Sequence, residues 1–136
     1  MKISESTISI LRNFSDINAN ILFTPGKTLQ TMSTMKNIMA KADVEENFES
    51  EFGVYDLPEF LRALDSFQQP MLNFNGSANL KIKDEKSSLS ARYAFADKST
   101  LRYPTKVISM PDKTVTFTLK DSDWESVKKL YTNLSL

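Results

Sequence analysis

The chain has 136 residues, with 17 lysines and arginines, 17 aspartates and glutamates, and neither cysteine nor histidine. A hydrophobic fraction of 40% is enough for one core of ordinary domain size, and a net charge of zero excludes a strongly basic nucleic-acid coat or a polyacidic tail. The missing residue types exclude disulfides, thiol catalysis, zinc–thiolate and imidazole metal sites and Ser–His–Asp triads, and the three glycines form no phosphate-binding loop.

The first predicted element is an amphipathic helix close to Met1. Ile3, Ile8 and Leu11 follow one another at intervals of five and three residues, and a helical face continues from them. Ser4 is a suitable N-cap, because its hydroxyl can accept a hydrogen bond from a free N–H group of the first turn.

Residues 28–42 have two interpretations. Near-helical spacing of apolar residues favours a helix weakly, and threonines in the same stretch favour strands. The apolar positions are Leu29, Met32, Met35 and Met39, and the threonines are Thr28, Thr31 and Thr34. Periodicity alone leaves both interpretations open.

A second amphipathic run covers residues 55–67 and repeats the intervals of the first. Asp56 and Glu59 form a capping-box pattern, and Pro58 is tolerated in the first turn, where its missing N–H is not needed. This pattern predicts a second helix with one buried face.

Strands are predicted after this helix. Residues 71–74 precede a tight turn at Asn75-Gly76, and alternation over residues 79–96 predicts a hairpin that turns at Asp84-Glu85-Lys86. Residues 97–113 contain two prolines and no clear period, which is typical of a linker.

The last elements are a strand at 114–119, where apolar residues alternate with threonines, and a third amphipathic run over 119–131. The third helix start, at Lys120 or Asp121, is less clearly capped than the first two. The three helix starts lie 52 and then 64 residues apart, which indicates an internal repeat, with chance similarity of three short helices as the alternative.

Acidic residues are concentrated in one block. Residues 43–65 contain eight acidic residues and one basic residue, whereas residues 1–42 contain five basic and two acidic residues. A divalent-metal site would need carboxylates that converge from separate elements. The acids of this block instead follow one another along one strand and turn, so we expect an outward acidic surface, made of Asp43, Glu45, Glu46, Glu49 and Glu51.

Three stretches of the chain, residues 1–22, 52–64 and 118–130, resemble the DNA polymerase sliding clamps of T-even-type bacteriophages. They read MKISESTISILRNFSDINANIL, FGVYDLPEFLRAL and TLKDSDWESVKKL, and they occur in the order of that family. The resemblance implies an α+β clamp fold made of β-α-β-β-β units, with helices at 4–17, 56–67 and 120–133 packed on antiparallel sheet. It also implies that residues 28–42 form two strands that turn near Lys36-Asn37.

The chain departs from the family in length, because a phage clamp subunit has two such domains. We therefore expect residues 1–96 to be a first clamp domain, 97–113 an interdomain linker and 114–136 the opening strand and helix of an incomplete second domain. A partial gene is one explanation, and a shortened homologue is the other.

The resemblance implies helices that present basic side chains to phosphates without contacts to bases. The candidate residues are Arg12, Arg62, Lys128 and Lys129, with ordinary solvated helix charges as the alternative. Arg12 and Lys128 occupy equivalent positions in the repeat.

Catalytic residues, a metal site and cofactors are not expected. Aromatic residues on the predicted strands are expected in the core rather than on a platform that stacks single-stranded bases.

The implied function is that of a non-enzymatic processivity factor that encircles duplex DNA and tethers the replicative polymerase, with a small phage nucleic-acid-binding or structural module as the alternative. The implied partners are duplex DNA, the replicative DNA polymerase and the clamp loader. The family forms a homotrimer, whereas this chain is expected as a monomer or an improvised dimer. No membrane segment is expected, and the implied location is the cytoplasm of the infected bacterial host.

Overall fold

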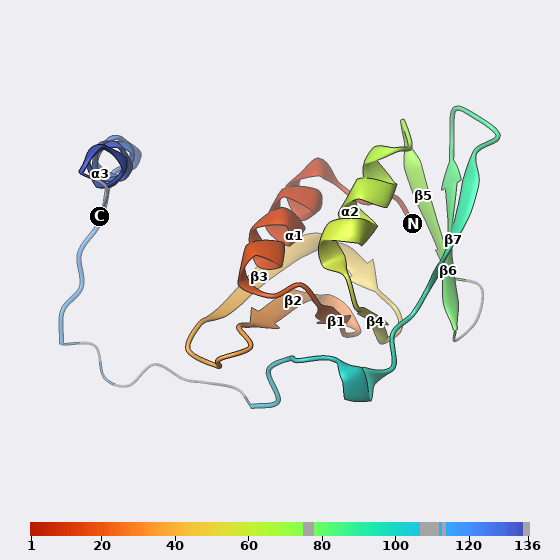
Figure 1. Cartoon of the computed structure of the whole chain (residues 1–136), viewed down its shortest axis with the longest axis horizontal. Helices are drawn as coiled ribbons and strands as arrows, with labels where there is room; N and C mark the ends of the chain where they lie inside the picture. Colours follow the sequence, from red (N-terminus) through yellow and green to blue (C-terminus); the bar gives the residue numbers. More distant parts are fainter. Residues whose placement is uncertain (75–77, 107–111, 113, 135–136) are drawn as a thin grey trace. The chain divides into compact units, whose positions relative to one another are not determined.

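The computed structural model describes residues 1–74, 78–106, 112 and 114–134. The chain divides into two compact units, Met1–Lys106 and Val107–Leu136. The first unit contains two α-helices, seven strands and one 3-10 helix in its described residues, and the second contains one helix (Figure 1). In chain order the elements are α1 (Glu5–Ile17), β1 (Ile21–Phe23), β2 (Gly26–Met32), β3 (Met39–Phe48), β4 (Phe52–Val54), α2 (Leu57–Asp65), β5 (Pro70–Phe74), β6 (Asn79–Asp84), β7 (Ser90–Ala94), η1 (Lys98–Thr100) and α3 (Asp121–Asn133).

The three helices begin close to where the sequence predicts them. The Ser4 hydroxyl accepts a hydrogen bond from the Thr7 N–H at 3.2 Å, and the Asp56 carboxylate accepts one from the Glu59 N–H at 2.8 Å. Lys120 precedes α3 without a side-chain cap. These contacts satisfy N–H groups that a helix start leaves without intrahelical partners.

All strand pairs of the described residues are antiparallel. β2 pairs with β3, β1 pairs with β4, and β5, β6 and β7 form a sheet in that order. Residues 28–42 are therefore two strands, and the turn between them contains Lys36 with φ 58°. The resemblance predicted this arrangement correctly, and the weak helical periodicity was misleading.

The helices α1 and α2 lie side by side and cover the core of the first unit (Figure 1). Leu11 and Phe14 of α1 and Phe60 of α2 are almost completely buried. Phe23, Phe48 and Phe52 belong to the same core, with the rings of Phe23 and Phe52 stacked at 4.4 Å, so these aromatic residues are core and not a binding platform.

Residues after β7 continue to pack with the first unit. Gly53 of β4 forms a bridge with Ala96, Leu101 is buried, and the Arg102 N–H donates to the side-chain oxygen of Asn20 at 2.9 Å. The compact unit accordingly ends at Lys106.

The strand predicted at 114–119 is absent: residues 115–120 have no regular secondary structure. Val115 and Phe117 are about four-fifths exposed, at 79% and 78%, so the expected core position of the strand aromatics is wrong for Phe117. A strand needs a neighbour to accept its backbone hydrogen bonds, and the described residues provide none there. The predicted turn at Asn75-Gly76 and part of the predicted linker lie outside the described residues.

Candidate functional site

Two of the four predicted basic residues lie together on the helix face of the first unit. Arg12 of α1 and Arg62 of α2 line the same shallow groove, of about 310 Å³. Each arginine is next in sequence to a buried leucine, Leu11 or Leu61, that anchors its helix to the core. Amphipathic periodicity therefore fixes both arginine side chains at the exposed side of the helix pair.

Arg12 is paired with an acid of the neighbouring helix. One guanidinium nitrogen donates to both carboxylate oxygens of Asp65, at 2.7 and 2.9 Å. The two side chains are 53% and 49% exposed, so water and salt screen this pair and a competing anion can reach the guanidinium.

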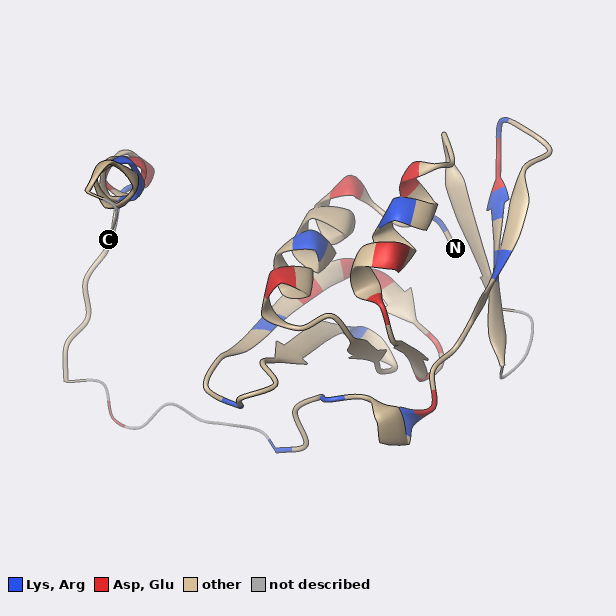
Figure 2. Cartoon of the chain, in the orientation of Figure 1, with Lys and Arg blue, Asp and Glu red and all other residues tan. Residues whose placement is uncertain are grey.

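The helix face of α1 and α2 has more acidic than basic residues. Figure 2 shows blue and red segments alternating along α1 and α2. The two helices together contain two basic residues against four acidic ones, namely Arg12 and Arg62 against Glu5, Asp16, Glu59 and Asp65. Attraction of a polyanion to this face therefore depends on individual arginines rather than on the summed field.

Lys128 and Lys129 lie on α3, in the second unit. Both are exposed, and the Lys128 ammonium forms an ion pair with Glu125 one helical turn earlier. Both lysines lie among the exposed residues of a helix whose apolar side chains, including Trp124 and Leu130, are also about half exposed. The structure thus brings Arg12 and Arg62 together, and it describes Lys128 and Lys129 in a separate unit.

The predicted acidic surface is correct for four residues and wrong for Glu46. Asp43, Glu45, Glu49 and Glu51 are exposed, and Glu51 accepts two hydrogen bonds from Lys98 at 2.9 and 2.8 Å. In the described residues no group of three or more acids is arranged to hold a metal ion.

Glu46 is buried beneath the start of α1, with 8% of its surface exposed. Its carboxylate accepts hydrogen bonds from the Ser4 N–H and from the Thr7 hydroxyl. Burial raises the pKa of Glu46, but the hydrogen bonds from Thr7 and Ser4 outweigh burial and lower the pKa below its ordinary value. The negative charge also lies at the positive end of the α1 dipole. Glu46 lies two residues from Val44 and two from Phe48, so the period of a strand places it on their buried face, and this spacing is the sequence signal for its position.

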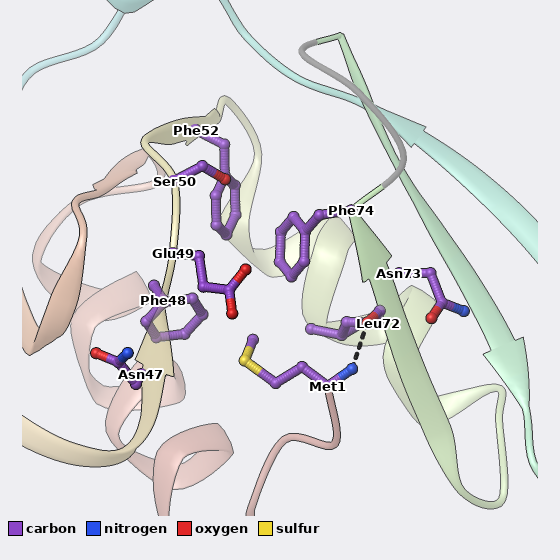
Figure 3. Close-up of a pocket in the computed structure, with 9 residues that line it drawn as sticks. All are labelled: Met1, Asn47, Phe48, Glu49, Ser50, Phe52, Leu72, Asn73 and Phe74. Carbon is purple, nitrogen blue, oxygen red and sulfur yellow. Dashed lines mark hydrogen bonds between the residues drawn. The ribbon is translucent and has the colours of Figure 1, made fainter.

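A hollow of about 590 Å³ lies between the end of β3 and β5. Figure 3 shows the rings of Phe48, Phe52 and Phe74 around it, with the Met1 side chain and the Glu49 carboxylate directed into it. The Met1 amine donates to the Leu72 carbonyl oxygen at 2.7 Å. Phe48 and Phe52 are at most 5% exposed, so the floor of this hollow is the outer surface of the aromatic core.

None of the helices in the described ranges is long and apolar enough to span a bilayer.

Comparisons with known proteins identify relatives of this chain. Residues 2–101 match the family model described as DNA polymerase processivity factor. The chain is 34% identical over 141 residues to a sliding clamp of Vibrio phage KVP40, 31% identical over 137 residues to a sliding clamp of Escherichia phage RB69, and 26% identical over 137 residues to a sliding clamp of Enterobacteria phage T4. Each match takes in the whole of this chain, which spans 62% of the first relative's length and 59% of the length of each of the other two.

Proposed function

The chain belongs to the DNA polymerase processivity factor family, and from this membership we propose that it acts as a sliding clamp in phage DNA replication. Its action is to encircle duplex DNA and tether the replicative polymerase, without catalysing a reaction. The observation that carries the proposal is the family match over residues 2–101, which covers nearly all of the first compact unit.

We propose a finer assignment of the fold as two β-α-β-β-β units. The Met1–Ile3 segment, which bridges to Met71 through Lys2, precedes α1 and three strands. β4 precedes α2 and three further strands in the same order. In this assignment residues 1–96 form a first clamp domain, 97–113 connect it onward, and 114–136 open a second domain.

We propose that the helix face contacts phosphates without reading bases. The residues are Arg12 and Arg62 on this face and, separately, Lys128 and Lys129 on α3 of the second unit. The supporting observation is that Arg12 and Arg62 share one exposed groove. A phosphate oxygen can replace Asp65 at the Arg12 guanidinium, because both anions present oxygen pairs to the same N–H donors. Phosphates are alike in every sequence, so such contacts can form at any position along the duplex and do not stop the protein from sliding.

The partners that follow are duplex DNA, the replicative polymerase and a clamp loader, in a ring of three subunits inside the infected host cell. The decisive experiment measures processive synthesis on a primed circular template, with the complete gene product and the polymerase and loader of the same phage. Stimulation of product length that requires a topologically closed template supports the proposal. Equal stimulation on a linear template with open ends would contradict encirclement.

The site is tested by changing Arg12 and Arg62 together to alanine. We expect shorter products on every template sequence, because phosphate contacts carry no sequence information. The matched control changes Lys27 and Lys41, two exposed lysines of β2 and β3, to alanine. An equal effect of the control would show that net charge, and not the helix face, is responsible.

A further inference from the structure

The sheet β5–β6–β7 has a basic face directed away from the core. Leu80 and Ile82 of β6 are buried, so Lys81 and Lys83, which alternate with them, point to the opposite side of the sheet. Arg92 of β7 is the register partner of Lys81 and lies on the same side. Figure 2 shows blue segments on this sheet.

Lys81 and Arg92 face each other at the closer of the two kinds of antiparallel pair. Hydrogen bonds from Phe95 N–H to the Ala78 carbonyl and from Asp84 N–H to the Leu89 carbonyl mark the hydrogen-bonded pairs of β6 and β7. Hydrogen-bonded and non-hydrogen-bonded pairs alternate along two antiparallel strands, so the pairs Leu80–Tyr93 and Ile82–Ala91 are also hydrogen-bonded. Lys81 and Arg92 lie between them and form a non-hydrogen-bonded pair, in which the Cα atoms are only about 4.5 Å apart. Like charges directly opposite each other destabilise a sheet.

The structure does not compensate this repulsion within the described residues. The ion pairs found there use Arg12, Lys98 and Lys128. The nearest acid on β6, Asp84, is buried and accepts hydrogen bonds from Gln68, Gln69, Lys86 and Ser87, so its charge is already used within the fold.

The basic face adjoins a free sheet edge. β7 is the last strand of its sheet, and no strand of the described residues pairs with its other side. The backbone N–H and C=O groups of Ala91 and Tyr93 form the hydrogen bonds to β6. The same groups of Ser90, Arg92 and Ala94 therefore point away from β6, toward the free edge. The edge therefore offers both donors and acceptors beside a row of cations.

We propose that β7 is a docking edge for an extended acidic segment of a partner protein. The segment adds to the sheet as a further strand beside β7 and presents carboxylates at every second residue to Arg92, Lys81 and Lys83. A second copy of β7 is a poor occupant, because pairing two copies brings the cations together. A nucleic-acid backbone is also a poorer fit, because phosphates accept hydrogen bonds but give none to the β7 carbonyl groups.

The experiment titrates the full chain with a fluorescently labelled, capped peptide of about nine residues that alternates valine and glutamate. We expect anisotropy to rise on binding, the amide resonances of Ser90, Arg92 and Ala94 to shift, and affinity to fall as salt is added. Changing Lys81 and Arg92 together to glutamate should weaken binding about tenfold or more, since attraction becomes repulsion. The double variant replaces a pair of like positive charges by a pair of like negative charges, so its free energy of unfolding should be close to that of the parent. The control Lys41→Glu, on the exposed side of β3, should bind the peptide as the parent does.

A single change, Arg92→Glu, separates binding from folding. It removes the like-charge pair, so the melting temperature should rise while affinity for the acidic peptide falls. Three results would overturn the proposal: equal binding of a peptide with lysine in place of glutamate, equal binding of a peptide whose backbone N–H groups are methylated, or tighter binding of duplex or single-stranded DNA at the same residues.

Discussion

The pair between Arg12 and Asp65 gives the sharpest test of the helix face. Changing Asp65 to asparagine keeps the size of the side chain and removes the charge that holds the guanidinium. Both side chains are about half exposed, so the pair contributes only about 0–1 kcal/mol to folding, and the protein should stay folded. Under the proposed phosphate contact, the released Arg12 guanidinium would bind a phosphate without competition from Asp65.

The magnitude follows from counterion release. Each phosphate neutralised on duplex DNA adds about 0.9 to the slope of log K against log salt concentration. We therefore expect Asp65→Asn to tighten association with a short linear duplex at low salt and to steepen the slope by about one unit, as measured by fluorescence anisotropy over a salt series.

The matched control is Asp16→Asn. Asp16 lines the same groove and is not one of the ion-paired acids of the described residues, so its change alters net charge equally without releasing Arg12. A control that steepens the slope as much as Asp65→Asn would refute the reasoning and assign the effect to net charge.

Three further predictions concern folding. Glu46→Gln should lower the free energy of unfolding by about 1–3 kcal/mol in urea titrations, because the amide keeps one acceptor oxygen and its NH2 group cannot accept the second of the two buried hydrogen bonds. The control Glu45→Gln should change it by less than about 0.5 kcal/mol. Burial raises the pKa of Asp84, but four hydrogen bonds outweigh burial and lower it from 3.8 to about 2. The stability from this lowered pKa is present above pH 3.8 and lost as pH falls toward 2; acid titrations of Asp84→Asn should lack that loss. Gly53→Ala places a Cβ 2.5 Å from the Leu101 side chain, so it should cost about 1–3 kcal/mol and speed proteolysis near Leu101.

The helices could be predicted from the sequence because their signals are local. Ser4 and Asp56 are caps that act within one turn, and the apolar intervals that follow them are set by helix geometry alone. The strands within residues 28–42 could be predicted only from the family resemblance, because the threonines favoured strands and the methionine spacing favoured a helix. Their pairing depends on contacts between residues that lie far apart in the sequence.

Glu46 could not be assigned from charge alone. A run of acids reads as solvated surface, whereas the position of Glu46 depends on α1 crossing β3 so that Ser4 and Thr7 reach the carboxylate. The same holds for Arg12, because its partner Asp65 lies 53 residues away on another helix. Tertiary packing decides which charges are free, and the sequence pattern shows only which are present.

The charges of the helix face also bear on how a sliding clamp would move. A ring retains DNA by enclosure, so two arginines among four acids suffice if each contact forms and breaks as the duplex passes. In the proposed function Arg12 would alternate between Asp65, its partner in the structure, and a phosphate, and this exchange would lower the barrier between successive positions. Removing Asp65 would make the phosphate contact more persistent, so we expect a loaded ring of the Asp65→Asn variant to diffuse more slowly along DNA than the parent in single-molecule tracking, with the difference shrinking as salt rises. Diffusion that stays as fast as in the parent while affinity for the duplex increases would show that Arg12 does not exchange between these two partners.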